Sequence, residues 1–406
     1  MIIIFRFLLA IFILLTVIYA SSPLFWQYFE SKINKIEGRV PYKVSKDALD
    51  FHSTLFVTDL HGDPLFSYRN LLRHNSTGHM DIPRLIEGNI SLQVFGVPTQ
   101  IPLFANLERN QSRIGLAGFL AFALHWPLKT WYSGKNRALY LAEKLHELEA
   151  KSEGTLSIIK TSGQLEEYSQ RSITETHRTA GLLMLEGAHV IKRIPEDLEE
   201  LYHRGFRIIG LTHLTDNHLG GSAHGIEKGG LTELGRKAVQ RMEELHMIID
   251  LTHASSELMD DVLAMTSRPV LVSHTGVKGC VDNSRNLSDE QLKAVASKGG
   301  LIGIGFWEEA VGLQGVESIA DSIQYASQLV GVKHIALGSD FDGGVTIPFD
   351  ASDMVHITDA LIKQGFSQEE IRMIMGGNAL NFLMNGLPEN VLPRRKIPND
   401  EMIHPE

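Results

Sequence analysis

The sequence predicts an α/β protein built on a closed (β/α)8 barrel of the TIM type. From residue 55 onward, short apolar and β-branched runs alternate with stretches of helical periodicity. The runs occupy residues 55–60, 91–97, 181–185, 206–211, 247–251, 269–272, 301–306 and 334–338. Repeated β-α units of this number favour a closed barrel. The rival is a doubly wound open sheet, but Gly303-Ile-Gly305 lacks the third glycine of a phosphate-binding fingerprint.

The chain begins with a hydrophobic segment. Residues 7–20 are apolar except for one Thr, and the apolar character resumes in residues 23–29. Residues 1–30 therefore read as a signal peptide or a membrane anchor, which predicts an exported or membrane-associated protein. We favour the anchor, although basic residues follow the segment and favour a cytoplasmic body, so orientation stays open. Residues 31–50 are expected to form a linker.

The predicted barrel occupies residues 51–388 and is followed by a polar tail at 389–406. Residues 99–180 are too many for an ordinary βα loop, and they contain helical stretches at 116–126 and 137–151. We expect them to form an insertion over the barrel mouth. Between two strand candidates, Leu234, Ala238, Met242 and Leu245 share one helical face, and Thr232 is placed as its N-cap.

Composition removes several classes of function. The chain has 406 residues, 43% of them hydrophobic, and a formal net charge of -10. An acidic chain of this kind is a poor partner for nucleic acid. The single cysteine, Cys280, excludes an internal disulfide framework and any cysteine-based zinc cluster. Histidine, aspartate and glutamate remain as candidate metal ligands.

Chemistry-bearing side chains recur where the predicted strands end. The relevant residues are His61 and Asp63, Glu186, His213, His253, His274, and Asp340 with Asp342. A lone histidine in such a place is more often a hydrogen-bonded core residue, and an Asp-Gly ending is often only a turn. However, the carboxyl ends of barrel strands all meet at one face, so these endings together predict a single site.

The set of side chains is large enough for two divalent ions. His61, Asp63, Glu186, His253 and His274 are the predicted metal ligands, with His213 and Asp340 nearby. Nitrogen and oxygen ligands without thiolate suit zinc, and manganese or cobalt stay open. Two ions would bring four positive charges against Asp63, Glu186, Asp340 and a bridging hydroxide, so the buried cluster would be close to neutral.

At this point the sequence resembles the membrane dipeptidase (renal dipeptidase) family of amidohydrolase-type metal barrels, from about residue 52 to 385. The segments that carry the resemblance are Asp59-Leu-His-Gly-Asp63, Leu185-Glu-Gly187, Leu211-Thr-His213, Gly229-Gly-Leu-Thr-Glu-Leu-Gly235, Ile249-Asp-Leu-Thr-His253, Val272-Ser-His274, Ser284-Arg-Asn286, Gly338-Ser-Asp-Phe-Asp-Gly343 and Gly376-Gly-Asn378. Their combined order is specific, although each segment alone is weak. Gly62 departs from the family motif, which has Asn there.

The resemblance implies a dinuclear zinc dipeptidase that hydrolyses dipeptides by a metal-bridging hydroxide. It implies that His61 and Asp63 bind one zinc, that His253 and His274 bind the other, and that Glu186 bridges them. It further implies that Asp340 moves the proton, that His213 and Arg285 contact substrate, and that the chain forms a homodimer. Two alternatives stay open: a metal-dependent deacylase or lactonase on the same barrel, and a catalytically retired, membrane-tethered binding protein.

Overall fold

The computed structural model describes residues 2–37, 43–111, 115–172, 175, 177–313 and 315–393. Eight parallel strands close into a barrel in the order β3-β2-β10-β9-β8-β7-β6-β5, and β5 pairs back with β3. The strands are β2 (Val57–Gly62), β3 (Ile90–Pro98), β5 (Thr179–Glu186), β6 (Phe206–Gly210), β7 (Ile248–Asp250), β8 (Leu271–Thr275), β9 (Leu301–Ile304) and β10 (Ile335–Leu337). This closure confirms the predicted barrel and excludes the open sheet.

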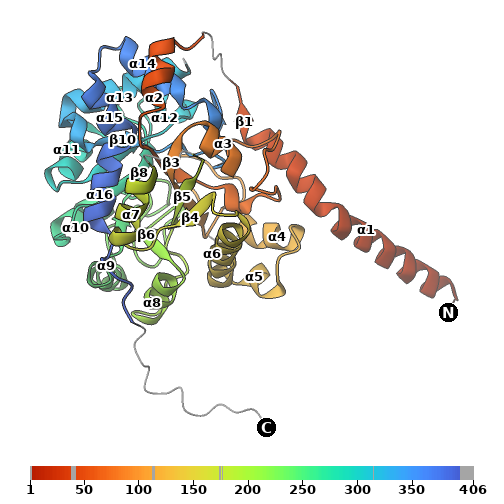
Figure 1. Ribbon diagram of the computed structural model, residues 1–406. Helices are drawn as coiled ribbons and strands as arrows, with labels where there is room; N and C mark the ends of the chain where they lie inside the picture. Colours follow the sequence, from red (N-terminus) through yellow and green to blue (C-terminus); the bar gives the residue numbers. More distant parts are fainter. Residues whose placement is uncertain are drawn as a thin grey trace.

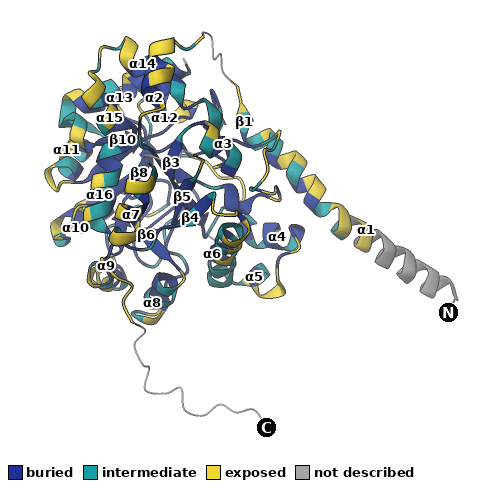
Figure 2. Ribbon diagram, viewed as in Figure 1, coloured by how far each residue is buried: buried dark blue, intermediate teal, exposed yellow. Residues whose placement is uncertain are grey.

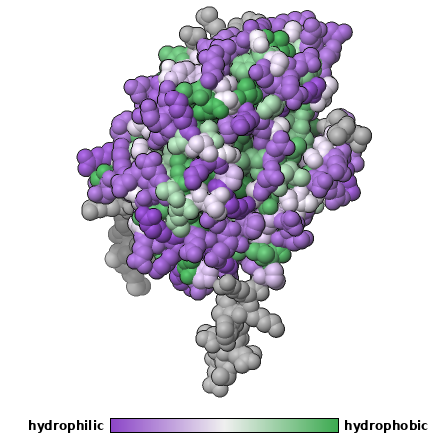
Figure 3. Space-filling view, turned by 90° about the vertical axis from the view of Figure 1, so that its left-hand side faces the viewer, coloured by the Kyte–Doolittle hydropathy of each residue, from purple (hydrophilic) through white to green (hydrophobic). Residues whose placement is uncertain are grey.

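Helices surround the barrel, and the strands lie buried at its centre (Figures 1 and 2). The surrounding helices are α3 (Ile82–Glu87), α8 (Glu196–His203), α9 (Glu233–Glu244), α10 (Ser256–Met265), α11 (Asp289–Ser297), α12 (Glu308–Val311), α13 (Val316–Val330), α14 (Val355–Lys363), α15 (Gln368–Arg372) and α16 (Asn378–Gly386). The face turned to the viewer in Figure 3 is largely hydrophilic, with hydrophobic residues in separate patches. Amphipathic helices of this kind bury an apolar stripe and leave charge in water.

Helix α9 shows how local sequence sets these elements. The Thr232 side chain accepts a hydrogen bond from the amide of Gly235, as expected of an N-cap. Ala238 and Met242 are buried on the predicted shared face, and Leu245 is buried as the C-cap residue. The helix therefore begins where its cap and its apolar periodicity place it.

The long segment after β3 divides between two places. Its elements are α4 (Leu116–Ala123), α5 (Leu128–Tyr132), α6 (Gly134–Lys151), β4 (Leu156–Ile158) and α7 (Ser162–Ser172). Residues 101–107 and parts of α4 line the cavity at the barrel mouth. Strand β4 instead pairs with the first residues of β5, at the amino-terminal end of the barrel. Only the first part of the segment therefore covers the mouth.

Helix α1 (Ile2–Ile33) precedes the barrel and extends away from it at its amino-terminal end (Figure 1). Within the described residues, no helix combines the length and apolarity needed to cross a bilayer. The region predicted as a linker contains β1 (Lys35–Ile36) and the start of α2 (Lys46–His52), whereas 38–42 lie outside the described residues. Strand β1 pairs in parallel with β11 (Thr346–Ile347). Residues 394–406 of the predicted tail also lie outside the described part.

Candidate metal centre

The predicted ligands converge at the carboxyl ends of the barrel strands, with Glu186 at their centre. Its Oε1 lies 3.2 Å from His253 Nε2 and 3.6 Å from both His61 Nε2 and His274 Nε2. Its Oε2 lies 3.6 Å from His213 Nε2. One carboxylate at the last residue of β5 thus faces histidines from four other strand ends.

Two further carboxylates complete the cluster around His61. The Nε2 atom of His61 lies 3.6 Å from Asp63 Oδ1 and 3.8 Å from Asp340 Oδ1. The donor atoms form three overlapping groups, each compact enough to hold an ion: His61, Glu186 and His274; Glu186, His213 and His253; and His61, Asp63 and Asp340. The groups contain every predicted ligand together with His213 and Asp340.

The strand ends differ in detail from the sequence prediction. His61 and His274 lie inside β2 and β8 instead of just after them, because both strands run further toward the mouth than expected. His253 and Asp340 adopt left-handed backbone, each with φ of 63°. Such angles are uncommon outside glycine and concentrate at functional sites.

Close packing around the cluster depends on one glycine. A Cβ atom at Gly96 of β3 would lie 2.1 Å from Asp63 Oδ1 and 2.9 Å from His61 Cε1. Only a residue without a side chain lets β3 pass beside this ligand pair. At Gly62, where the related motif has Asn, a Cβ would lie 2.8 Å from Met80 Sδ, so Met80 occupies that space here.

The polar atoms of the cluster call for a cation. Among the described residues, buried atoms without a hydrogen-bond partner include His61 Nδ1 and Nε2, Asp63 Oδ1, Glu186 Oε2 and His253 Nδ1. Buried polar atoms are normally paired, because leaving them unpaired costs free energy. A bound metal ion would satisfy several of them at once, so the residues fit a metal site.

The electrostatics support the same conclusion. Burial and the neighbouring Asp63 carboxylate raise the pKa of Glu186 well above its usual range. Burial opposes charge on His61, but the Glu186 and Asp63 carboxylates outweigh it and raise the His61 pKa to about 10. Burial holds the pKa values of His213, His253 and His274 well below the ordinary value, which leaves neutral imidazoles that can bind a metal.

A layer of buried acids beneath the cluster holds it in place. Asp59 accepts hydrogen bonds from the Ser339 amide at 2.7 Å and from Gln93 Nε2 at 2.8 Å. Asp250 accepts from the Ser273 amide at 2.8 Å. Sequence reasoning assigned no role to either acid. The available signal was a carboxylate inside an apolar strand, two or three residues before a predicted ligand.

Arg285 and Asp340 lie in the same cavity as the cluster. The Arg285 guanidinium donates a hydrogen bond to the His274 carbonyl at 2.6 Å and lies 5.1 Å from the Trp307 ring centre. Burial lowers its pKa to about 10, so it remains cationic at neutral pH. Burial raises the Asp340 pKa to about 7, although His61 opposes this shift.

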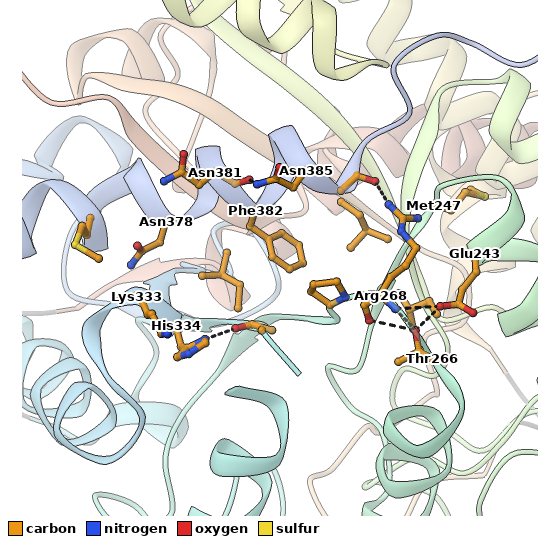
Figure 4. A pocket seen from close by; sticks show the side chains of 18 residues that line it. Glu243, Met247, Thr266, Arg268, Lys333, His334, Asn378, Asn381, Phe382 and Asn385 are labelled. Carbon is orange, nitrogen blue, oxygen red and sulfur yellow. Dashed lines mark hydrogen bonds between the residues drawn. The ribbon is translucent and has the colours of Figure 1, made fainter. Parts of the chain in front are cut away.

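A second cavity, of about 410 Å³, lies at the amino-terminal end of β7, β9 and β10 (Figure 4). Its polar side chains bond to the fold: Glu243 accepts from Thr266, His334 pairs with the Gly300 carbonyl, and Asn378 donates to two carbonyls. Arg268 donates to the Gly386 carbonyl. The bonds of Asn378 and Arg268 tie α16 to the bottom of the barrel, which is a structural role.

A closed (β/α)8 barrel with a buried histidine and carboxylate cluster at its carboxyl end defines a metal-dependent barrel hydrolase. The profile of the membrane dipeptidase family, peptidase family M19, matches residues 46–385, and the chain belongs to that family.

Individual relatives agree with this assignment. The chain is 28% identical to the dipeptidase verJ of Clonostachys rogersoniana over 345 residues, covering 80% of this chain and 87% of the relative. It is 27% identical to an uncharacterized dipeptidase of Schizosaccharomyces pombe, covering 80% and 79%. The fold resembles a metallo peptidase from Rhodobacter sphaeroides liganded with a phosphinate mimic of L-Ala-D-Ala, with a TM-score of 0.69, 23% identity, and coverage of 82% and 99%.

Proposed function

We propose that this chain, a metallo-dipeptidase of the M19 family, works with two zinc ions held by His61, Asp63, Glu186, His253 and His274. The observation that carries this proposal is the position of Glu186, whose two oxygens face four histidine nitrogens at 3.2 to 3.6 Å. Its Oε1 faces the proposed ligands His61, His253 and His274, and its Oε2 faces His213. A carboxylate between donors in this way would be suited to bridging two ions. Bound zinc supplies Lewis-acid polarisation of the scissile carbonyl and a water of lowered pKa.

Asp340 is proposed to move the proton. Its carboxylate lies at the edge of the cluster, 3.8 Å from His61, and it lines the cavity in which a substrate would lie. In that place it can take a proton from the attacking water and return it to the leaving amine, which is general acid-base catalysis.

His213 is proposed to stabilise the developing oxyanion. Its Nδ1 pairs with the Gln100 carbonyl at 3.1 Å, which orients the ring and directs Nε2 toward Glu186 and the cavity. Because Nδ1–H donates to the Gln100 carbonyl and burial keeps the free imidazole neutral, Nε2 can donate to an oxyanion only in the imidazolium form. The negative charge that develops on the oxyanion would favour this form by raising the His213 pKa.

Arg285 is proposed to bind the free carboxylate of the dipeptide. A buried guanidinium held by a carbonyl and an aromatic face retains donors for an anionic group, and Arg binds carboxylates in a bidentate pair. This contact would restrict the site to short peptides with a free C-terminus close to the scissile bond.

The test compares a dipeptide with its C-terminal amide. Wild-type protein should hydrolyse the free dipeptide with a kcat/KM at least about 100-fold above that of the amide, since a lost charge-assisted contact is worth roughly 3 kcal/mol. Arg285→Ala should raise KM for the free dipeptide, keep the zinc content and remove the preference. Equal rates on both substrates in wild type, or faster cleavage of N-acyl amino acids or lactones, would move the function to the deacylase or lactonase class.

Two other expectations remain predictions: the N-terminal segment 1–30 as a signal peptide or membrane anchor, and the homodimer. Gel filtration with light scattering and fractionation of membranes from expressing cells would test them.

A further inference from the structure

The last turns of α1 lie against the mouth of the metal-site cavity, although they precede the family domain, which begins at residue 46. The cavity holds about 1280 Å³, more than the roughly 300 to 1,000 Å³ of common small-ligand sites. From α1 its lining includes Phe25, Trp26, Phe29 and Ile33. From the metal-site cluster it includes Asp63, Glu186, His213, His253, His274 and Asp340. An element outside the range matched by the family profile thus contributes to the wall of the proposed active site.

Buried polar contacts fix this part of α1 in place. Glu30 pairs with Arg69 at 3.2 Å, and Arg69 in turn pairs with Asp342, two residues after Asp340. Asn34 Oδ1 accepts from the Gly344 amide at 2.7 Å. Separating a buried ion pair costs free energy, because it leaves an uncompensated charge in the protein interior. The helix is therefore joined to the loop that carries the proposed proton carrier.

Contacts of α1 nearer to its amino-terminal end also hold the helix in place. The Ser22 hydroxyl donates to the Ala123 carbonyl at 2.7 Å, and the Tyr19 ring stacks on His125 with 4.0 Å between ring centres. The helix therefore rests on α4 as well as on the barrel. Residues 19–34 therefore form a segment docked on the barrel domain.

The wall that this segment completes is apolar and partly uncovered. Phe25 and Phe29 on α1 are 67% and 39% exposed. Phe104 in the segment 101–107 is 88% exposed and Phe119 on α4 is 62% exposed, and both also line the cavity. Apolar surface gathered at a cavity gains free energy when a ligand covers it.

We infer that residues 21–34, with residues 101–107 and α4, form a specificity subsite for dipeptides that carry a large apolar side chain. The inference rests on the proposed function and adds the substrate class. The polar cluster and Arg285 bind the peptide backbone at the cavity floor, and the aromatic wall covers the side chain. A dipeptide of two small residues leaves this wall uncovered.

The experiment uses the full-length, zinc-loaded protein and measures kcat/KM for Ala-Ala, Phe-Ala and Ala-Phe. In the Phe25→Ala/Phe29→Ala double variant, kcat/KM should fall about tenfold for at least one Phe-containing dipeptide, since covering an aromatic side chain is worth more than the 1.36 kcal/mol that a tenfold change requires. For Ala-Ala it should stay within about twofold. Both side chains are partly exposed, so their loss leaves the core intact.

Tyr28→Ala is the matched control. Tyr28 is an aromatic residue on the same helix, 63% exposed, but it does not line the cavity. This variant should leave all three substrates unchanged. An equal fall for Ala-Ala and the Phe dipeptides in the double variant, or an equal effect of Tyr28→Ala, would overturn the subsite. The subsite would also be overturned if the double variant lost binding to phosphatidylcholine vesicles but kept the substrate preference of wild type. The aromatic wall would then contact a lipid surface instead of a substrate.

Binding measurements separate this inference from the proposed function. Calorimetry with two phosphinate dipeptide analogues, one with methyl and one with benzyl side chains, reports the subsite without turnover. If wild type cleaves no dipeptide, the proposed function fails. A tenfold loss of affinity for the benzyl analogue in the double variant, but not in Tyr28→Ala, would still support the subsite. Equal affinity for this analogue in wild type and the double variant would reject it.

Discussion

At the scale of single residues, the site is defined by what its acids do to its histidines. His61 sits among Asp63, Glu186 and Asp340, and those carboxylates hold its pKa at about 10 despite complete burial. His253 and His274, which also face Glu186, are kept neutral by burial and by neighbouring positive groups. The cluster therefore attracts positive charge at its centre and offers neutral lone pairs around it, which suits divalent metal.

Asp340 can be separated from the metal ligands by substitution. Asp340→Asn should keep two zinc ions per chain and lower kcat by about 10² to 10⁴, because an amide cannot accept the proton. Metal analysis of the purified variant and steady-state kinetics measure the two effects. Turnover at the wild-type rate would remove Asp340 from proton transfer, and loss of zinc would make it a ligand.

His213 poses a sharper question, because the structure groups it with Glu186 and His253 at ligand distance. As an oxyanion donor it should be dispensable for metal binding. His213→Ala should therefore retain both zinc ions while kcat falls about 10² to 10³. A variant that binds only one zinc would show that His213 belongs to the ligand set.

At the scale of elements, the sequence predicts the barrel strands well because each is a short apolar run, and six of the eight runs end at a histidine or a carboxylate. The buried core of a parallel barrel leaves little choice for residues such as Val57 or Ile248. Strand limits were less accurate: β8 ends at Thr275, so His274 lies within it. In the sequence, polar residues such as Ser273 and His274 indicate the start of a loop. In the structure they form the last part of the strand, at the mouth of the barrel.

The docking of α1 could not be predicted. Its anchor depends on Glu30, Arg69 and Asp342, which are far apart in the chain and meet only in the folded protein. The apolar run beside Glu30 also has the composition of a signal peptide or membrane anchor. For this reason the sequence does not indicate that its aromatic residues line a cavity. Pairings of this kind depend on tertiary structure and leave no periodic signal.

The ion-pair network at this junction makes an asymmetric stability prediction. Arg69→Met should lower the free energy of unfolding by about 3 to 5 kcal/mol, because it leaves two buried carboxylates without a cation. Glu30→Gln should cost only about 1 kcal/mol, because Arg69 keeps Asp342 as partner. Urea unfolding of the two full-length variants measures both values. Equal losses of unfolding free energy in the two variants would show that Arg69 does not stabilise the Glu30 and Asp342 carboxylates in this way.

At the scale of the whole molecule, one end of the barrel does chemistry and the other closes the fold. The carboxyl ends of the strands carry buried polar atoms without partners among the described residues, a large cavity and strained backbone at His253 and Asp340. The amino-terminal ends carry polar groups that bond to neighbouring backbone and side chains. This division is general for (β/α)8 enzymes, and it explains why the active-site face was predictable from the side chains that end the strands.

The central claim is that a two-zinc cluster drives dipeptide hydrolysis, and zinc titration tests it most directly. The full-length protein would be stripped with a chelator and titrated with zinc while the hydrolysis of Ala-Ala is measured. The account predicts no activity without metal and a rise that reaches its plateau at two zinc ions per chain, with Glu186→Gln failing to reach it. Full activity in the metal-free protein, or a plateau at one zinc, would contradict the account.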